Sequence, residues 1–221
     1  MDTLPIYTIG DSHSRWTFVF DDDESTKHSR IARTYRVGAI TMHRVGRDTL
    51  SFSDYSVPKD GIVISCFGEI DIRCHIERQR QAGRDEDSIL RELVDAYMVA
   101  LEHNRKNGYK YIAVMNVVPV LEYAFKLHSP HIKLNLESGD PSFPYLGTND
   151  ERKRYTYNIN MLLHDACKQH NFGYLDVYNC HVNENGYLRP EYSDGMCHIR
   201  CFKFTDRILD SMIESFKPDT C

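Results

Sequence analysis

The stretch that decides the fold is Leu4-Pro5-Ile6-Tyr7-Thr8-Ile9-Gly10-Asp11-Ser12-His13-Ser14. The β-branched and aromatic residues from Ile6 to Ile9 predict a short strand, and Pro5 stands near its start, where a strand tolerates proline. Gly10 lets the backbone turn sharply where a side chain would clash. A helix beginning just beyond would leave Ser12 beside free N–H groups, at the sheet edge where α/β proteins bind ligands. Ser12 is therefore a candidate nucleophile, although serine in this place is also a common helix cap.

Length and composition limit the class of protein. A chain of 221 residues without a linker predicts a single domain over residues 1–221, and 41% hydrophobic and 27% charged residues are typical of a globular protein. A net charge of −5 argues against a nucleic-acid surface, which needs a basic stripe. The sequence has no apolar run of about 18 residues, so no membrane span is predicted. The seven scattered cysteines and the absence of a signal-peptide pattern predict reduced thiols in a cytoplasmic protein.

Apolar runs and helical patterns alternate along the rest of the chain. Strands are predicted at residues 35–41, 61–67, 111–119 and 172–178, and helices at 85–102, 150–170 and 204–216. We expect loops through residues 43–47 and 127–149. This alternation predicts a three-layer α/β/α sandwich around a five-stranded parallel sheet.

The carboxyl ends of parallel strands meet at one edge of the sheet, because the crossovers between them are right-handed. The residues that this edge would collect are Ser12, Gly38, Gly68, Asp71, Asn116 and the loop from Asp194 to His198. Their convergence is the physical argument for an active site.

The pattern resembles the SGNH (GDSL-type) hydrolase superfamily, which has a flavodoxin-like fold. The resemblance runs from residue 4 to about residue 200 and rests on blocks at the ends of the predicted strands. These blocks are Gly10-Asp11-Ser12-His13, a glycine after the second strand, Gly68-Glu69-Ile70-Asp71, and a terminal Asp…His pair. Phe67 to Asp71, with Arg73 and His75, is similar to the third block of a variant branch.

The resemblance implies a serine esterase without cofactor or metal. Ser12 would attack an acyl carbonyl, His198 would take its proton, and Asp194 would orient the imidazole. The N–H groups of Ser12 and of a glycine, Gly38 in preference to Gly46, would stabilise the oxyanion. The implied substrates are small esters or O-acylated glycans, with O-acetyl favoured, because the branch is similar to modules of polysaccharide modification systems.

Two departures from the family pattern widen the range of functions. Ile70 stands where the third block has an asparagine that serves the oxyanion, so Arg73 or Asn116 would have to replace it. Gly68 is a further candidate for oxyanion or substrate binding. Asp194 lies four residues before His198 instead of three. An acyltransferase and a glycan-binding module with weakened catalysis therefore remain alternatives to the esterase.

Several of these residues also have structural interpretations. His198 is either the base or a loop histidine bonded to a backbone carbonyl. Asp71 and Glu69 are interpreted as a structural cluster, with Asp11 and Asp71 in supporting roles, and Arg73 is left open between substrate contact and anchor.

Histidine and cysteine outside the triad predict no further chemistry. His13 and His75 are interpreted as packing or solvent-facing residues. Cys197, His198 and Cys201 match no spacing of zinc ligands, and no second cysteine pair accompanies them, so no metal is predicted.

Overall fold

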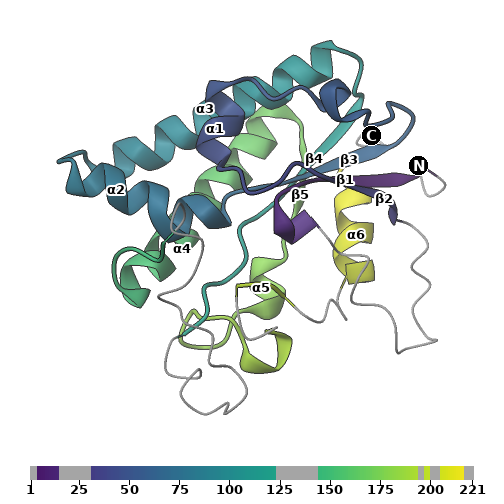
Figure 1. Ribbon diagram of the computed structural model, residues 1–221. Coiled ribbons are helices and arrows are strands. Elements are labelled where there is room, and N and C mark those ends of the chain that lie inside the picture. Colours follow the sequence, from purple (N-terminus) through teal and green to yellow (C-terminus); the bar gives the residue numbers. More distant parts are fainter. Residues whose placement is uncertain (1–3, 15–30, 123–143, 194–196, 200–204, 217–221) are drawn as a thin grey trace.

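A single parallel sheet organises the fold (Figure 1). The computed structural model describes residues 4–14, 31–122, 144–193, 197–199 and 205–216. The strands are β1 (Ile6–Gly10), β2 (Ile31–Arg36), β3 (Ile62–Cys66), β4 (Tyr111–Met115) and β5 (Gly173–Leu175). They lie in the order β2-β1-β3-β4-β5 and every neighbouring pair is parallel, which confirms the predicted five-stranded sheet.

The helices follow the strands along the chain and cover both faces of the sheet. The longer ones are α1 (Met42–Arg47), α2 (Ile76–Gln81), α3 (Glu86–Lys106), α4 (Asn149–His170) and α6 (Thr205–Glu214). The short ones are η1 (Ser12–Ser14), η3 (Phe52–Tyr55), the π-helical η4 (Asp71–His75), α5 (Tyr178–His181) and η7 (Pro190–Tyr192). Helices α1, α3 and α4 pack on one face and α6 on the other (Figure 1), which confirms the three-layer sandwich.

Burial on both faces explains the composition of the central strands. Every residue of β1 and β3 is buried, and both read as nearly continuous apolar runs, as strands between two helical layers do. Gly10 pairs with Cys66 at the carboxyl ends of these strands. A Cβ on Gly10 would lie 2.1 Å from the Cys66 carbonyl oxygen, so only glycine fits there.

The predicted helices at residues 85–102, 150–170 and 204–216 are confirmed as α3, α4 and α6, with small shifts at their ends. Asp85 caps α3 by accepting from the Ser88 N–H. Thr148 and Glu151 form a capping box that begins α4. Of the predicted loop at 127–149, the part up to residue 143 lies outside the described residues.

The prediction of the second strand at residues 35–41 is wrong at both ends, because β2 begins four residues earlier, at Ile31. Strand β2 ends at Arg36, and Gly38 follows with a φ of +106°. Thr41 then accepts from the Arg44 N–H at 3.0 Å and caps helix α1, where the sequence pattern predicted a loop. Helix α1 is only six residues long, too short for its apolar period to stand out in the sequence.

Gly46 lies inside α1, where this helix crosses α3. A Cβ on Gly46 would lie 2.8 Å from the carbonyl carbon and the Cβ of Ala96. The N–H of a residue at this depth in a helix bonds to the carbonyl four residues before it. The prediction of Gly46 as an oxyanion donor is therefore wrong, and this glycine serves close helix packing.

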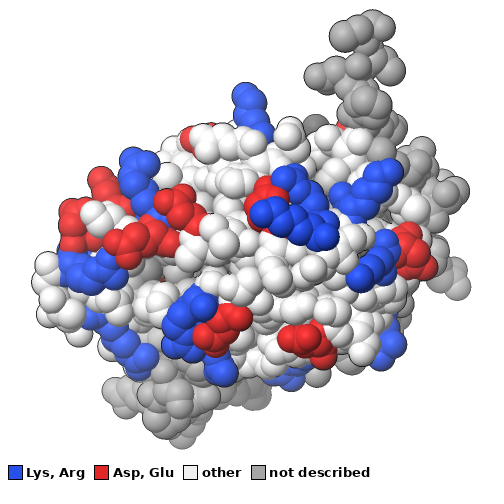
Figure 2. Space-filling model, turned by 90° about the horizontal axis from the view of Figure 1, so that it is seen from above, with Lys and Arg blue, Asp and Glu red and all other residues white. Residues whose placement is uncertain are grey.

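Charges of both signs stand side by side on the face seen from above (Figure 2). Ion pairs link the helices of one layer: Arg80 of α2 lies 3.1 Å from Glu151 of α4, and Arg154 of α4 lies 2.8 Å from Glu86 of α3. Within the described residues, no helix combines the length and the apolar character needed to cross a membrane.

Replacement of Gly46 by alanine is expected to lower the free energy of unfolding by about 1–3 kcal/mol, because the added methyl group overlaps α3. Urea unfolding measures this change. Arg44→Ala, on the exposed side of the same helix, is the matched control and should change stability by less than about 0.5 kcal/mol. Equal stability of Gly46→Ala and the wild type would contradict the close crossing.

Candidate active site

Ser12 and His198 meet at the carboxyl edge of the sheet. The Ser12 Oγ lies 2.9 Å from the His198 Nε2, although 186 positions separate the two residues. Ser12 follows β1 directly, and His198 lies in the segment 197–199, which a β-bridge between Ser193 and Ile199 fastens. Both side chains are partly exposed, so the pair is open to a substrate. The hydroxyl thus contacts a distant imidazole, a contact that a helix cap does not make.

The turn that presents Ser12 is held by backbone groups and by neighbouring side chains. The Ser14 Oγ donates to the Asp11 carbonyl at 2.7 Å, and the Thr8 hydroxyl donates to the Ser14 carbonyl at 2.9 Å. The Asp11 N–H bonds to the Cys66 carbonyl at 3.3 Å. These bonds fix the backbone on both sides of Ser12, so its hydroxyl is presented in one direction.

His13 is a residue that the sequence interpretation missed. Its N–H and its Nδ1 lie 2.8 and 3.0 Å from the Asp11 Oδ1, and its Nε2 lies 3.1 Å from the Cys197 carbonyl oxygen. Its ring also lies against that of His198, with centroids 4.8 Å apart. Burial disfavours the charged imidazole, but the Asp11 carboxylate outweighs burial and raises the pKa of His13 well above its usual range. A cationic His13 donates from both nitrogens, so it ties Asp11 to the segment that carries His198.

The Cys197 thiol lies next to the same imidazoles. Its Sγ is 3.8 Å from the His198 Nε2. Burial raises the pKa of Cys197, but hydrogen bonds with His13 and His198 outweigh it and lower the pKa to about 5. His13, Cys197 and His198 are also the residues of this site whose nitrogen and sulfur atoms lie close enough together to hold a metal ion.

Asp194, the predicted partner of the His198 ring, lies outside the described residues. Asp11 is linked to the pair through His13, whose ring lies against that of His198. It is only 1% exposed, and its Oδ1 makes both contacts with His13. The contact between Asp11 and His13 is consistent with the supporting role that the sequence predicts for Asp11.

The side-chain amide of Asn116, just after β4, bonds to residues in and just after β5. Its Nδ2 donates to the Tyr174 hydroxyl at 3.0 Å and to Asp176 at 2.8 Å. Its Oδ1 accepts from the N–H groups of Val177 and Tyr178 at 2.9 and 3.0 Å. An amide side chain has two donor hydrogens and two acceptor lone pairs, and all four are used. The prediction of Asn116 as an oxyanion donor is therefore wrong.

Asp71 binds the start of helix α1, which agrees with the structural interpretation of this carboxylate. Its two oxygens accept from the N–H groups of Met42 and His43 at 2.5 and 3.1 Å. The side chain is fully buried. Burial raises the pKa of Asp71 to about 7, and the two N–H groups oppose this rise.

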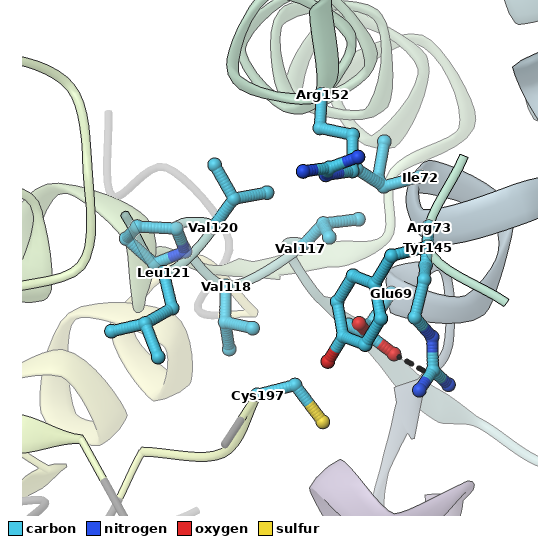
Figure 3. A pocket seen from close by; sticks show the side chains of 11 residues that line it. Glu69, Ile72, Arg73, Val117, Val118, Val120, Leu121, Tyr145, Arg152 and Cys197 are labelled. Atoms are coloured by element: carbon cyan, nitrogen blue, oxygen red, sulfur yellow. Dashed lines mark ion pairs between the residues drawn. The ribbon is translucent and has the colours of Figure 1, made fainter. Parts of the chain in front are cut away.

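A pocket lies beside Cys197 (Figure 3), with about 450 Å³ of free space when the open solvent at its mouth is included. Residues 117–121 form an apolar wall, and Glu69, Arg73, Tyr145 and Cys197 line the polar side. The Arg73 Nη2 lies 3.2 Å from the Glu69 Oε2, and the guanidinium lies over the Tyr145 ring. Burial raises the pKa of Glu69 to about 7, with Cys197 adding to the shift and Arg73 opposing it. Ser12 is not among the lining residues, so the pocket reaches the pair through Cys197.

The two remaining glycines stand after β2 and β3. Gly38 has room for a side chain, and its φ of +106° is what favours glycine. The Val37 N–H before it donates to the Gly10 carbonyl at 2.8 Å, which keeps Gly38 near the start of the Ser12 turn. A Cβ on Gly68 would lie 2.6 Å from a methyl carbon of Val117, so this glycine is needed for packing.

Comparison with solved structures shows the same fold in known proteins. A GDSL-like lipase from Bacteroides thetaiotaomicron is similar over 96% of this chain and 86% of its own, with a TM-score of 0.54 and 14% identity. The acetyl xylan esterase AlAXEase is similar over 97% of this chain and 100% of its own, with a TM-score of 0.51 and 13% identity. An α/β hydrolase enzyme from the metagenome of Lake Arreo is similar over 96% of this chain and 94% of its own, with a TM-score of 0.50 and 12% identity. No family model and no curated protein matches the sequence.

Alkylation of Cys197 by iodoacetamide is expected to be nearly as fast at pH of about 6.5 as at pH of about 8.5, because a thiol of pKa about 5 is already thiolate at both. Mass spectrometry of the labelled peptide gives the rate. Cys66, which is buried and whose pKa burial raises, is the control that should stay unlabelled. A rate that climbs roughly tenfold per pH unit over this range would contradict the lowered pKa.

Proposed function

We propose that this protein is a serine-dependent ester hydrolase with Ser12 as nucleophile and His198 as general base. The observation that carries the proposal is the 2.9 Å contact between the Ser12 Oγ and the His198 Nε2. This is the distance a base needs to take the hydroxyl proton as the oxygen attacks. A binding module that had lost catalysis has no need to keep these two side chains in contact.

The reaction proceeds in two halves. The Ser12 Oγ adds to the acyl carbonyl and its proton passes to the His198 Nε2. Collapse of the tetrahedral intermediate transfers that proton to the leaving alcohol and leaves an acyl group on Ser12. A water molecule, deprotonated by His198, then adds to this ester. Collapse of the second tetrahedral intermediate breaks the bond to the Ser12 Oγ, which takes the proton back from His198, and the acid is released. Asp194 is proposed to hold the other ring nitrogen of His198.

The oxyanion is proposed to bind N–H groups of the backbone. The Ser12 N–H and the Gly38 N–H remain the candidates, and the commitment of the Asn116 amide to other partners supports a backbone site. Arg73 is proposed to contact a polar group of the bound substrate, because its guanidinium lines the adjoining pocket.

Small O-acyl groups on glycans are the proposed substrates, with O-acetyl favoured. The pocket beside Cys197 has an apolar wall for a short acyl chain and polar side chains for the rest of the ester. Similar folds in acetyl xylan esterases add support for this substrate class. Transfer of the acyl group to a glycan acceptor shares the first half of the reaction, and dependence of turnover on added acceptor distinguishes it from hydrolysis.

Ser12→Ala and His198→Ala are each expected to lower turnover of a short activated acetyl ester by about 10⁴-fold or more, because each removes one member of a unit that acts together. Ser53→Ala and His164→Ala are the matched controls, since both residues are exposed and lie on other elements, η3 and α4. Circular dichroism and thermal unfolding should be alike for all the variants. Wild-type turnover by Ser12→Ala would refute the proposal.

His13→Gln tests the positioning role of the second imidazole. Loss of its contact with the Cys197 carbonyl and of its ring against His198 should lower kcat by about 10²-fold, the cost of a displaced catalytic group. Loss of the neighbouring positive charge makes protonation of His198 easier, so the acidic limb of the kcat/KM profile should move to higher pH.

The matched control for His13→Gln is His75→Gln. His75 also lies in a stacked histidine pair, with its ring centroid 4.2 Å from that of His43. This variant should leave the pH profile in place. A His13→Gln profile that superimposes on the wild type, with reduced kcat, would leave His13 with a structural role alone.

A further inference from the structure

Three metal-binding side chains converge on the catalytic pair. Donor atoms of His13, Cys197 and His198 all lie within 4.8 Å of one another. The Cys197 Sγ and the His198 Nε2 are 3.8 Å apart. A tetrahedral zinc site with Zn–N of about 2.0 Å and Zn–S of about 2.3 Å separates such atoms by about 3.5 Å. Small side-chain adjustments therefore suffice to bring the three donors onto one ion.

We propose that His13, Cys197 and His198 bind one zinc-like divalent cation, and that the bound cation blocks the proposed ester hydrolysis. Two imidazole nitrogens and one thiolate sulfur are ligands that favour Zn²⁺. Mg²⁺ and Ca²⁺ prefer oxygen ligands and are not expected to bind here. The fourth position is left to water or to the Ser12 hydroxyl, which already lies 2.9 Å from the His198 Nε2.

Asp11 prepares His13 for this role. Its Oδ1 lies 3.0 Å from the His13 Nδ1, so the Nε2 on the opposite side of the ring is the atom for the metal. A carboxylate that bonds the far nitrogen of a metal-binding histidine orients the ring and strengthens the bond to the metal. The His13 Nε2 would release its proton to solvent and exchange its contact with the Cys197 carbonyl for the cation.

Inhibition follows from the shared atom. The His198 Nε2 is the nitrogen that receives the Ser12 proton in the proposed reaction, and a nitrogen that binds a cation cannot accept a proton. The inhibition rests on the proposed function. Binding of the cation by these three side chains does not depend on it. Cys197 and His198 are both partly exposed, which gives a cation access from solvent.

Binding is tested with Co²⁺ as a spectroscopic probe and with Zn²⁺ in competition, on the chelator-treated full chain. The wild type is expected to bind one equivalent of Co²⁺, with the visible absorption of a four-coordinate ion and a thiolate-to-cobalt band in the near ultraviolet. Cys197→Ser should lose that band and bind Zn²⁺ at least about 10- to 100-fold more weakly, since loss of even a residue that orients a ligand costs this much. Cys180→Ser, a second partly exposed cysteine, is the matched control and should behave as the wild type.

Turnover with and without Zn²⁺ tests the inhibition, with each protein compared to its own rate in chelator. Zn²⁺ should inhibit the wild type and Cys180→Ser at stoichiometric concentration, and Cys197→Ser only at concentrations higher by the same factor. Mg²⁺ should not inhibit. Absence of the thiolate band in the wild type, or equal Zn²⁺ affinity of Cys197→Ser, would overturn the site. Cobalt binding without ester turnover in chelator would instead refute the proposed function and leave the metal site standing.

Discussion

The close approach of β1 and β3 at their carboxyl ends is the constraint on which the site depends. Gly10 meets the carbonyl of Cys66 where no side chain fits, and the next N–H, that of Asp11, bonds to the same carbonyl. The chain therefore leaves the sheet at a fixed point and in a fixed direction. Ser12 is the first residue beyond that point to turn its side chain toward the loop of His198. A wider separation of the strands would leave the serine without a defined direction.

Local patterns were enough to predict the layers of the fold. The runs at residues 61–67 and 111–119 are apolar because the sheet is covered on both sides, and this signal needs no knowledge of partners. The pairing of Ser12 with His198 followed from the resemblance and from the rule that parallel strands end at one edge. The short helix α1 was not predicted, because six residues are too few to show an apolar period. Its start is also held by Asp71, a residue almost thirty positions later in the chain.

For Asn116 and His13 the difficulty was that hydrogen-bond partners cannot be read from a sequence. Asn116 stands at a strand end, as a catalytic amide would, yet its four hydrogen-bonding positions go to residues around β5. His13 was interpreted as a packing or solvent-facing residue, because its contact with the Cys197 carbonyl joins residues 184 positions apart. One local signal for His13 was present, since an aspartate and a histidine flank the serine.

The carboxylate of Asp71 has a mechanical consequence. Both of its oxygens accept from N–H groups in the first turn of α1, and Arg73, two residues later, lines the pocket. Helix α1 in turn presses against α3 without a side chain between them at Gly46. These contacts join α1 and α3 to the segment that carries Arg73. The opposite wall is held as well, because the N–H and the carbonyl of Val117 both bond to the Asn160 amide of α4 at 2.8 Å. A ligand of different size therefore meets a cleft whose two sides are both fixed to the helical layer.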